Sequence, residues 1–185
     1  MATQQTLAIL ESAFAHDAAM GELRGVDALM EQLRLYSEWF GNPKLHLQRV
    51  EAVAPGVMAA TATLNVTVTE LTLRHVFPHL VESAGENNCE RLCQRLLGQR
   101  LDCSSAVTFL FDEDSDRIVR LEASIDMMTP LLRMLGSIED ASDLEASIDM
   151  MTPLLRMLGS IEDASEVLKH SRITAECTIS CAPDQ

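Results

Sequence analysis

A 22-residue segment of this chain occurs twice, letter for letter. Residues 121–142 read LEASIDMMTPLLRMLGSIEDAS and residues 144–165 repeat them, so the period is 23 residues. Repeat proteins that have diverged keep a pattern of residues rather than identical letters. Such identity indicates a very recent or a constructed duplication, and the sequence does not distinguish the two. One of the two equal segments must therefore occupy a place that a single-copy fold does not provide.

Each copy combines a strand pattern with a helix pattern. In the first copy, residues 121–128 alternate in polarity, and Thr129-Pro130 begins a helix, because proline in the first turn loses no hydrogen bond. This copy follows a polar turn and Ile118-Val119, whose burial is worth about 2–4 kcal/mol. We therefore predict that the first copy enters the sheet. The natural downstream continuation, which begins with Val167 and Leu168, follows the second copy. The two ends of the fold therefore prefer different copies, and the stretch between them is spare.

The second copy carries an apolar stripe with the 4, 3, 4, 3 spacing of a helix. Its members are Leu144, Ile148, Met151, Leu155 and Leu158. Such a stripe folds back on its own domain, inserts into a neighbouring chain as in domain swapping, or stays a loop, and its apolar character makes the loop the weakest option. We therefore predict that these residues form an assembly seam and that the chain is a homodimer or a higher homo-oligomer.

The remaining chain places helices before strands. Apolar spacing predicts helices over residues 3–16 and 26–40, and alternation predicts strands. The predicted strands cover 45–53, 58–69, 99–111 and 118–126, and residues 70–97 are ambiguous. This order indicates one α+β domain over 1–185, with N-terminal helices packed on a curved antiparallel sheet.

Three short stretches carry a family resemblance. They are Phe14-Ala-His-Asp-Ala-Ala-Met20, Gly25-Val-Asp-Ala-Leu29 and Asp114-Ser-Asp-Arg-Ile-Val-Arg-Leu121. In this order the chain resembles the NTF2-like superfamily, in particular its SnoaL-like members. It is most similar to the NTF2-like domain of oomycete proteins that also carry a basic-zipper-type DNA-binding region. The resemblance covers about residues 5–142 and about 166–178; the family pattern has a single copy of the repeated segment, and this chain has no zipper.

The resemblance implies a cone with an open mouth. Such cones host isomerases, dehydratases and cyclases, and also non-catalytic binding or dimerising modules, so the fold does not decide the function. The enzymes use an acid/base pair inside an apolar cavity. His16-Asp17 is a candidate pair, but neighbours at a helix end point in different directions. Asp126 shares strand parity with polar residues, so we expect it to face outward. No catalytic set is assigned.

Apolar and aromatic side chains on the predicted helix and strands are candidates for a ligand pocket. They are Tyr36, Trp39, His46 and Phe109. A core tyrosine with its hydroxyl satisfied is the simpler interpretation of Tyr36. The expected ligand is small and apolar, and no cofactor is expected.

Composition excludes several classes of function. The net charge is −14, with 28 acidic against 14 basic residues, so direct nucleic-acid binding is not expected. No apolar run approaches the roughly 18 residues of a membrane span, and the N-terminus has no basic signal region. Cys89/Cys93 and Cys177/Cys181 have unusual spacing for zinc, so free thiols and no metal are expected. A nuclear or cytoplasmic location fits.

These observations leave three functional hypotheses. The first is a non-catalytic accessory module of a regulatory, transcription-factor-like protein, which dimerises or binds a small apolar ligand while the duplicated segment alters assembly. The second is a SnoaL-like isomerase, cyclase or dehydratase that acts on a small apolar ligand in the cone. The third is a structural variant that shows how a fold absorbs a tandem repeat.

Overall fold

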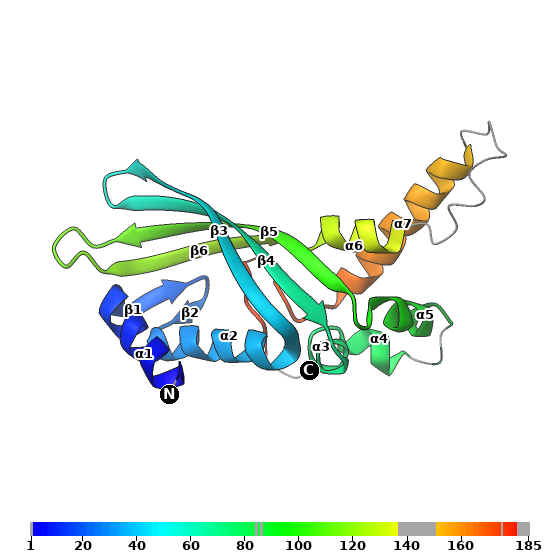
Figure 1. Cartoon of the computed structure of the whole chain (residues 1–185), viewed down its shortest axis with the longest axis horizontal. Coiled ribbons are helices and arrows are strands. Elements are labelled where there is room, and N and C mark those ends of the chain that lie inside the picture. Colours follow the sequence, from blue (N-terminus) through cyan, green and yellow to red (C-terminus); the bar gives the residue numbers. More distant parts are fainter. Residues whose placement is uncertain (1, 84, 86, 137–150, 175, 181–185) are drawn as a thin grey trace.

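A computed structural model describes residues 2–83, 85, 87–136, 151–174 and 176–180. It is an α+β structure in which helices pack on a six-stranded sheet (Figure 1). The strands are β1 (Phe14–Met20), β2 (Leu23–Arg24), β3 (Phe40–Ala54), β4 (Val57–Val68), β5 (Arg100–Phe111) and β6 (Ile118–Asp126). The helices are α1 (Ala2–Ala13), α2 (Val26–Trp39), α3 (Glu70–His75), α4 (Pro78–Glu82), α5 (Asn87–Leu96), α6 (Met128–Gly136) and α7 (Met151–Lys169).

The sheet is mixed rather than purely antiparallel. Its strand order is β2-β1-β6-β5-β4-β3, and β3 through β6 form antiparallel pairs. The expectation of an antiparallel sheet is wrong at one place, because β1 runs parallel to β6. A parallel neighbour is possible here because α2 and the long β3–β4–β5 meander separate the two strands in sequence.

The N-terminal strand was not predicted. Residues 14–16 were expected to end the first helix, whereas α1 ends at Ala13 and β1 begins at Phe14. Burial explains the difference, since Phe14, Ala18 and Met20 pack in a small core cluster with Ile118. Tertiary packing thus overrides a local sequence that has little strand propensity.

The ambiguous stretch 70–97 forms three short helices. Thr69 caps α3 through a capping box with Thr72, and Pro78 occupies the first turn of α4. These three helices, α3 to α5, and the C-terminal segment contribute to the main core, whose fully buried members include Phe77 and Leu92. This core lies at one end of the sheet and fixes the position of the strands that form the cone.

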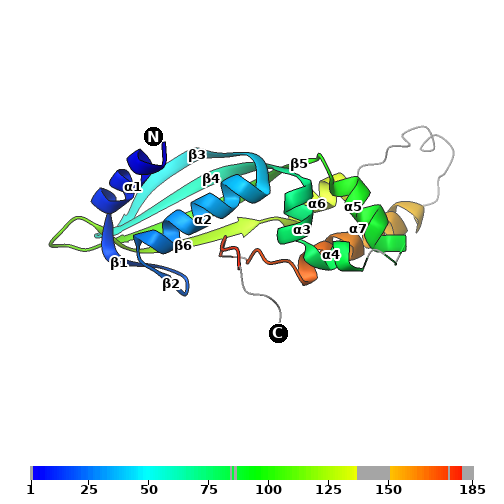
Figure 2. The ribbon, with the colours of Figure 1, turned by 90° about the horizontal axis from the view of Figure 1, so that it is seen from below.

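The two faces of the sheet differ in polarity. Residues that lie opposite one another in the ladder share a face. Leu47, Ala62, Ser105 and Ile125 form one row across β3 to β6, and this face is covered by α2 (Figure 2). The neighbouring row on the other face is polar and includes His46, Thr63, Ser104 and Asp126. The sheet therefore has an apolar inner face and a polar outer face.

The first copy of the repeated segment enters the sheet, as predicted. Its strand half extends β6 and its helix half forms α6. Of the two apolar residues before the first copy, both expected to be buried, Ile118 is buried and Val119 is exposed. A register shift between Leu110 and Phe111 of β5 places an extra residue in β6 at this point, so Val119 leaves the inner face.

The second copy returns to the domain through its tail. Its helix half forms the start of α7, which continues to Lys169 and packs against α6. Ala164 and Val167 of α7 are fully buried in the main core. A Cβ placed on Gly136 would lie 3.3 Å from Ser160 Oγ, so the end of α6 and the middle of α7 are in contact.

This contact joins two positions that a single-copy chain places side by side. Ser160 is the repeat equivalent of Ser137, the residue that follows Gly136. Residues 137–159 amount to one period of the repeat, so the two residues on either side of that period, Gly136 and Ser160, lie in contact. The N-terminal turns of α7 extend beyond the rest of the molecule (Figure 1).

Most of the predicted assembly seam lies outside the described residues. Leu144 and Ile148 fall in the undescribed stretch, and the side chains of Met151 and Leu155 are likewise undescribed. Leu158 is 61% exposed. Across the described chain, no helix has both the length and the apolar character of a membrane span.

Candidate functional site

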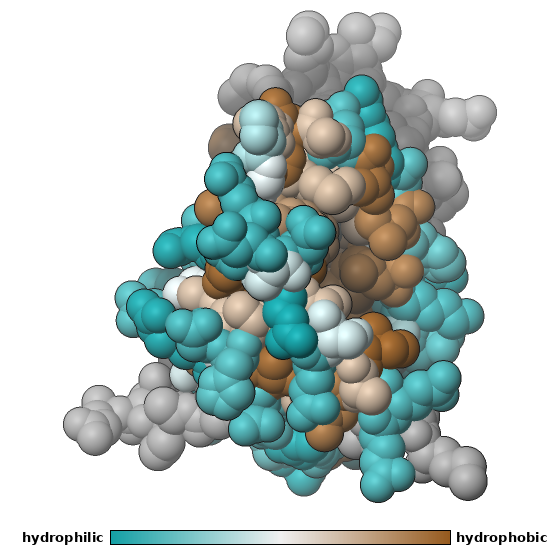
Figure 3. All heavy atoms as spheres, turned by 90° about the vertical axis from the view of Figure 1, so that its left-hand side faces the viewer, coloured by the Kyte–Doolittle hydropathy of each residue, from teal (hydrophilic) through white to brown (hydrophobic). Residues whose placement is uncertain are grey.

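An apolar cavity lies between α2, α1 and the inner face of the sheet. Its volume is about 360 Å³. The wall is formed by Leu10, Phe14, Met20, Leu29, Gln32, Leu33, Tyr36, Ser37, Pro43, Lys44, Leu45, Leu64, Ser105, Val107, Leu121, Ala123 and Cys177. Figure 3 shows the end of the molecule that carries the hairpins, where apolar side chains gather around a hollow. This cavity is the interior of the cone.

Two polar side chains of α2 on the cavity wall bind the C-terminal segment. The Gln32 amide donates to the Ile179 carbonyl (3.2 Å) and accepts from the Ile179 N–H (2.7 Å). The Tyr36 hydroxyl donates to the Cys177 carbonyl at 2.9 Å. Burial raises the pKa of the Tyr36 phenol well above its usual value. Both side chains therefore hold residues 177–179 against α2, and neither presents a titrating group to a ligand at neutral pH.

The thiol of Cys177, at the cavity wall, is also poorly reactive. Burial raises the pKa of the Cys177 thiol to about 11 and that of the nearby Cys103 thiol to about 12. A thiolate is the reactive form of cysteine, so these groups are poor nucleophiles at neutral pH. Among the described wall residues there is no Asp or Glu, and Lys44 supplies the charge. The wall thus lacks the carboxylate of an acid/base pair.

The four predicted pocket residues lie in different places. Tyr36 lines the cavity. Trp39 stacks on His75, with ring centroids 4.9 Å apart, and Phe109 packs with the small core cluster beside β1. His46 is exposed and lies on the outer face of β3. The structure therefore brings one of the four to the cavity wall.

The candidate acid/base residues do not meet in the cone. His16 and Asp17 are both exposed on β1, and neither belongs to the described cavity wall. Asp126 is exposed on the outer face, as expected. Its carboxylate accepts hydrogen bonds from the hydroxyl and the N–H of Thr129, which hold its pKa below the usual value. Asp126 thus fixes the first turn of α6.

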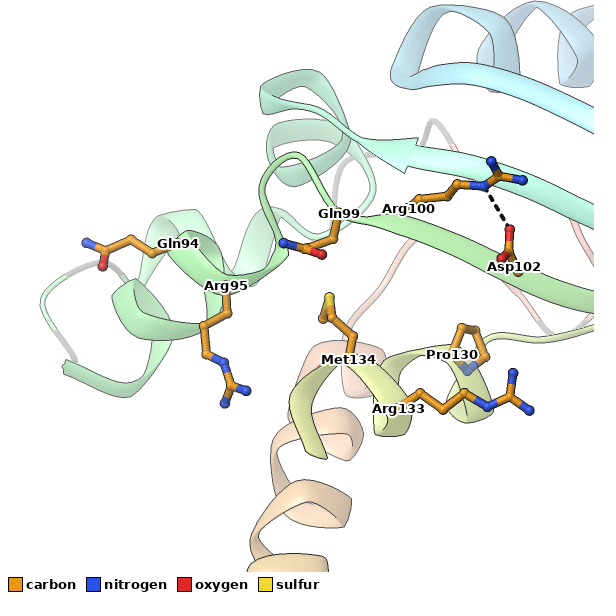
Figure 4. A pocket seen from close by; sticks show the side chains of 8 residues that line it. All are labelled: Gln94, Arg95, Gln99, Arg100, Asp102, Pro130, Arg133 and Met134. Atoms are coloured by element: carbon orange, nitrogen blue, oxygen red, sulfur yellow. Dashed lines mark hydrogen bonds and ion pairs between the residues drawn. The ribbon is translucent and has the colours of Figure 1, made fainter. Parts of the chain in front are cut away.

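A second hollow, of about 500 Å³, lies between α5, the start of β5 and α6 (Figure 4). Arginine side chains give it a basic lining. Arg95 donates to the Leu135 carbonyl at 2.8 Å, and Arg100 donates to Asp102 at 3.0 Å. Figure 4 shows that the guanidinium groups of Arg95, Arg100 and Arg133 lie apart and do not converge on one point. The cone cavity is therefore the better candidate site.

Sequence reasoning missed the polar clamp. The apolar stripe expected on the second helix ran through Leu29 and Leu33, whereas the structure buries Leu29, Gln32 and Leu35 and leaves Leu33 at the cavity rim. A glutamine three residues after one buried leucine and three before another is a signal for a buried hydrogen-bonding role. Its partner, Ile179, lies 147 residues away and had no such signal.

The described residues form no metal centre. No group of three or more His, Cys, Asp or Glu side chains within the described ranges lies close enough to hold an ion. Cys89, Cys93, Cys103 and Cys177 form no disulfide within the described residues, and Cys181 lies outside them.

Comparison with known proteins gives a short sequence match and a long structural one. The family described as the bZIP transcription factor 1 C-terminal domain matches residues 1–39. The bZIP transcription factor 1 of Phytophthora infestans is 64% identical over 36 residues, which are 20% of this chain and 15% of that protein. The chain thus matches a small part of the length of this relative.

Solved structures match most of the chain. A SnoaL-like polyketide cyclase from Agrobacterium tumefaciens aligns over 72% of this chain and 88% of its own, with a TM-score of 0.51 and 14% identity. An NTF2-like protein from Burkholderia thailandensis aligns over 69% of this chain and 84% of its own, with a TM-score of 0.45 and 14% identity. At such identity the cyclase likeness shows the fold alone. Together with the α2-covered sheet, it shows that this chain has an α+β fold like that of the SnoaL-like cyclase.

Proposed function

We propose that this chain is a non-catalytic accessory module that binds a small apolar ligand in its cone. The observation that carries the proposal is the chemistry of the cavity wall. Gln32 and Tyr36 are bonded to the C-terminal segment, and the Ser37 and Ser105 hydroxyls donate to backbone carbonyls. Lys44 is the charged group of a wall that is otherwise mostly apolar. A wall of this kind selects a ligand by the apolar surface that it removes from water.

The size of the cavity supports a small ligand. About 360 Å³ lies at the lower end of the volumes usual for small-molecule pockets. Each Å² of apolar surface buried contributes about 25 cal/mol, so a ligand that covers the aliphatic wall gains several kcal/mol without any ion pair. Lys44, at the rim, is compatible with a polar group on the ligand's outer end.

The sequence match supports a regulatory setting. Residues 1–39 are similar to the C-terminal domain of a bZIP transcription factor, and these residues form α1, β1, β2 and α2. They supply one side of the cavity, including Leu10, Phe14 and Leu29. We infer that the module serves a transcription-factor-like protein and that the repeated segment modifies its assembly.

An enzyme of the cyclase kind is the second candidate, and the fold of the Agrobacterium cyclase favours it. Such chemistry requires a group that exchanges a proton inside the cone. Tyr36 is the titratable aromatic group on the wall, but its hydroxyl already donates to Cys177 and its raised pKa keeps it protonated. The cavity chemistry therefore favours binding over turnover.

A titration with an uncharged apolar fluorophore, N-phenyl-1-naphthylamine, tests the binding proposal. Ala123 lines the cavity on β6, so Ala123→Phe fills part of the volume. Ala106 is an exposed alanine on the outer face of β5, so Ala106→Phe is the matched control. We expect saturable binding to the natural chain, at least tenfold weaker binding to Ala123→Phe, and unchanged binding to Ala106→Phe.

Two results would contradict the proposal. The first is the absence of saturable fluorescence enhancement for the natural chain. The second is equal affinity for the two phenylalanine variants, which would place the probe on the surface. Far-UV circular dichroism of each variant checks that the fold is kept.

A further inference from the structure

The edge strand β3 presents apolar side chains to solvent. Leu45, Leu47, Val50 and Val53 are 59%, 64%, 51% and 62% exposed. No described strand pairs with the outer edge of β3, which is fifteen residues long. A long edge strand with exposed leucines and valines is an association surface unless another element covers it.

These side chains extend the wall of the cone. Leu45 lies opposite Leu64 and both line the cavity, while Leu47 and Val50 lie opposite Ala62 and Ala60 on the same inner face. The apolar surface therefore runs from the cavity out to the free edge without interruption. The cavity is open on this side, so whatever covers β3 also completes the wall.

The opposite edge of the sheet offers no comparable surface. There β2 consists of Leu23–Arg24 alone. The sheet can therefore grow through β3 and hardly at all through β2. If the sheet can grow at a single edge, a two-fold axis that brings β3 of two copies together gives a closed pair. The pairing then uses up the free β3 edge of both copies.

The sequence of β3 is self-complementary in one antiparallel register. The shift between Leu47 and Arg49 puts both Leu45 and Val50 on the inner face and Glu51 on the outer face. Lys44 lies opposite Asn65 in the outer row, and its side chain also reaches the rim of the cavity. A two-fold axis next to Leu47 places Leu45 opposite Val50 of the second copy and Lys44 opposite Glu51. A two-residue slip places Lys44 opposite Arg49 instead, which like-charge repulsion disfavours.

We propose that two copies of this chain pair antiparallel through β3 in this register. Two Lys44–Glu51 pairs then form on the outer face, and Val50 of each copy packs beside Leu45 of the other, at the open side of the cone. Pro43 and the bulge next to Gln48 keep the pairing short, which favours a closed dimer over open-ended sheet growth. The second copy thereby contributes to the apolar wall of each cavity.

Charge reversal with rescue tests the dimer. Light scattering on a sizing column should give a dimer for the full chain in about 0.15 M salt, where contact ion pairs persist. Lys44→Glu places a carboxylate opposite Glu51, and Glu51→Lys places an ammonium opposite Lys44, so each single variant should dissociate at least tenfold more readily. The double variant K44E/E51K restores the opposite charges and should dimerise again. Arg24→Glu makes the same charge change as Lys44→Glu at the exposed β2 edge and should leave the dimer intact.

Three results would overturn the proposal. They are a monomeric full chain, a dimer that the single reversals leave unchanged, and a double variant that stays dissociated. Probe binding in the cone is measured separately on the full chain and on Glu51→Lys, because Lys44 lines the cavity and Glu51 does not. Saturable probe binding by a monomeric full chain would overturn the dimer and leave the binding proposal standing.

Discussion

At the scale of residues, two polar side chains of α2 attach the C-terminal segment to the domain. Gln32 satisfies both backbone groups of Ile179, and Tyr36 satisfies the carbonyl of Cys177. A buried polar group left without a partner costs about 1–3 kcal/mol, so these contacts hold the C-terminal segment firmly in place. The side chains of Gln32 and Tyr36 are thus committed to structure, which supports the proposal that the cavity binds a ligand.

One half-buried histidine gives the fold a pH dependence. His79 Nε2 lies 3.0 Å from the Glu166 carbonyl, so this nitrogen carries the proton, and Nδ1 is buried without a partner. Burial, with a smaller contribution from His170, lowers the pKa of His79. The unfolded chain therefore takes up the proton first as the pH falls below the ordinary value of about 6.5. Stability should be complete above neutrality and decline as the pH falls below that value.

Urea unfolding at pH 7.5 and pH 5.5 measures this dependence. His79→Gln should reduce the loss of stability between the two pH values. His46→Gln changes an exposed histidine of the outer face and should leave the loss as it is. An identical loss for His79→Gln and the natural chain would show that His79 does not contribute.

At the scale of elements, two identical sequences form different parts of the fold. Met128–Gly136 and Met151–Gly159 have the same sequence, yet the first forms α6, directly after the sheet strand β6, and the second forms the first half of α7, which runs to Lys169. Local propensity is the same in both, so their neighbours decide which place in the fold each copy takes. Upstream, Ile118 fixes the first copy in the sheet, and downstream, Val167 fixes the tail of the second copy in the core.

Matched substitutions in the two copies test this assignment. Leu131 of α6 is fully buried in the main core, so Leu131→Ala should lower the free energy of unfolding by roughly 2–5 kcal/mol. Leu154 is its counterpart in the second copy. Because Leu131 already fills the core position, Leu154→Ala should cost less than about 1 kcal/mol. Equal costs in urea unfolding would mean that the two copies share the position.

The sequence predicted the regular elements better than the irregular ones. The alternation of Ala60, Ala62 and Leu64 against threonines identified β4, because one of its faces is buried and the other polar. Phe14–Met20 has no such alternation, and its pairing with β6 depends on residues more than a hundred positions away. The bulge at Val119 and the Gln32–Ile179 clamp are likewise products of tertiary packing, which local patterns do not encode.

At the scale of the whole molecule, the repeat is absorbed without loss of the cone. The first copy supplies β6 and α6, the second copy supplies the tail of α7, and the contact between Gly136 and Ser160 closes the domain between them. Long surface insertions are tolerated because the entropy of closing a loop grows slowly with its length. The cavity, the C-terminal clamp and the free β3 edge all lie in the part that the insertion leaves unchanged.

Deletion of residues 137–159 tests this account most directly. The deletion joins Gly136 to Ser160 and removes one period of the repeat. The account predicts a folded chain that binds the naphthylamine probe as the full chain does. It should be as stable as the full chain or more stable by up to about 3 kcal/mol, the order of the loop-closure cost of 23 residues. Loss of cooperative unfolding or of probe binding in the shortened chain would contradict the account, because the repeated segment would then be part of the cone itself.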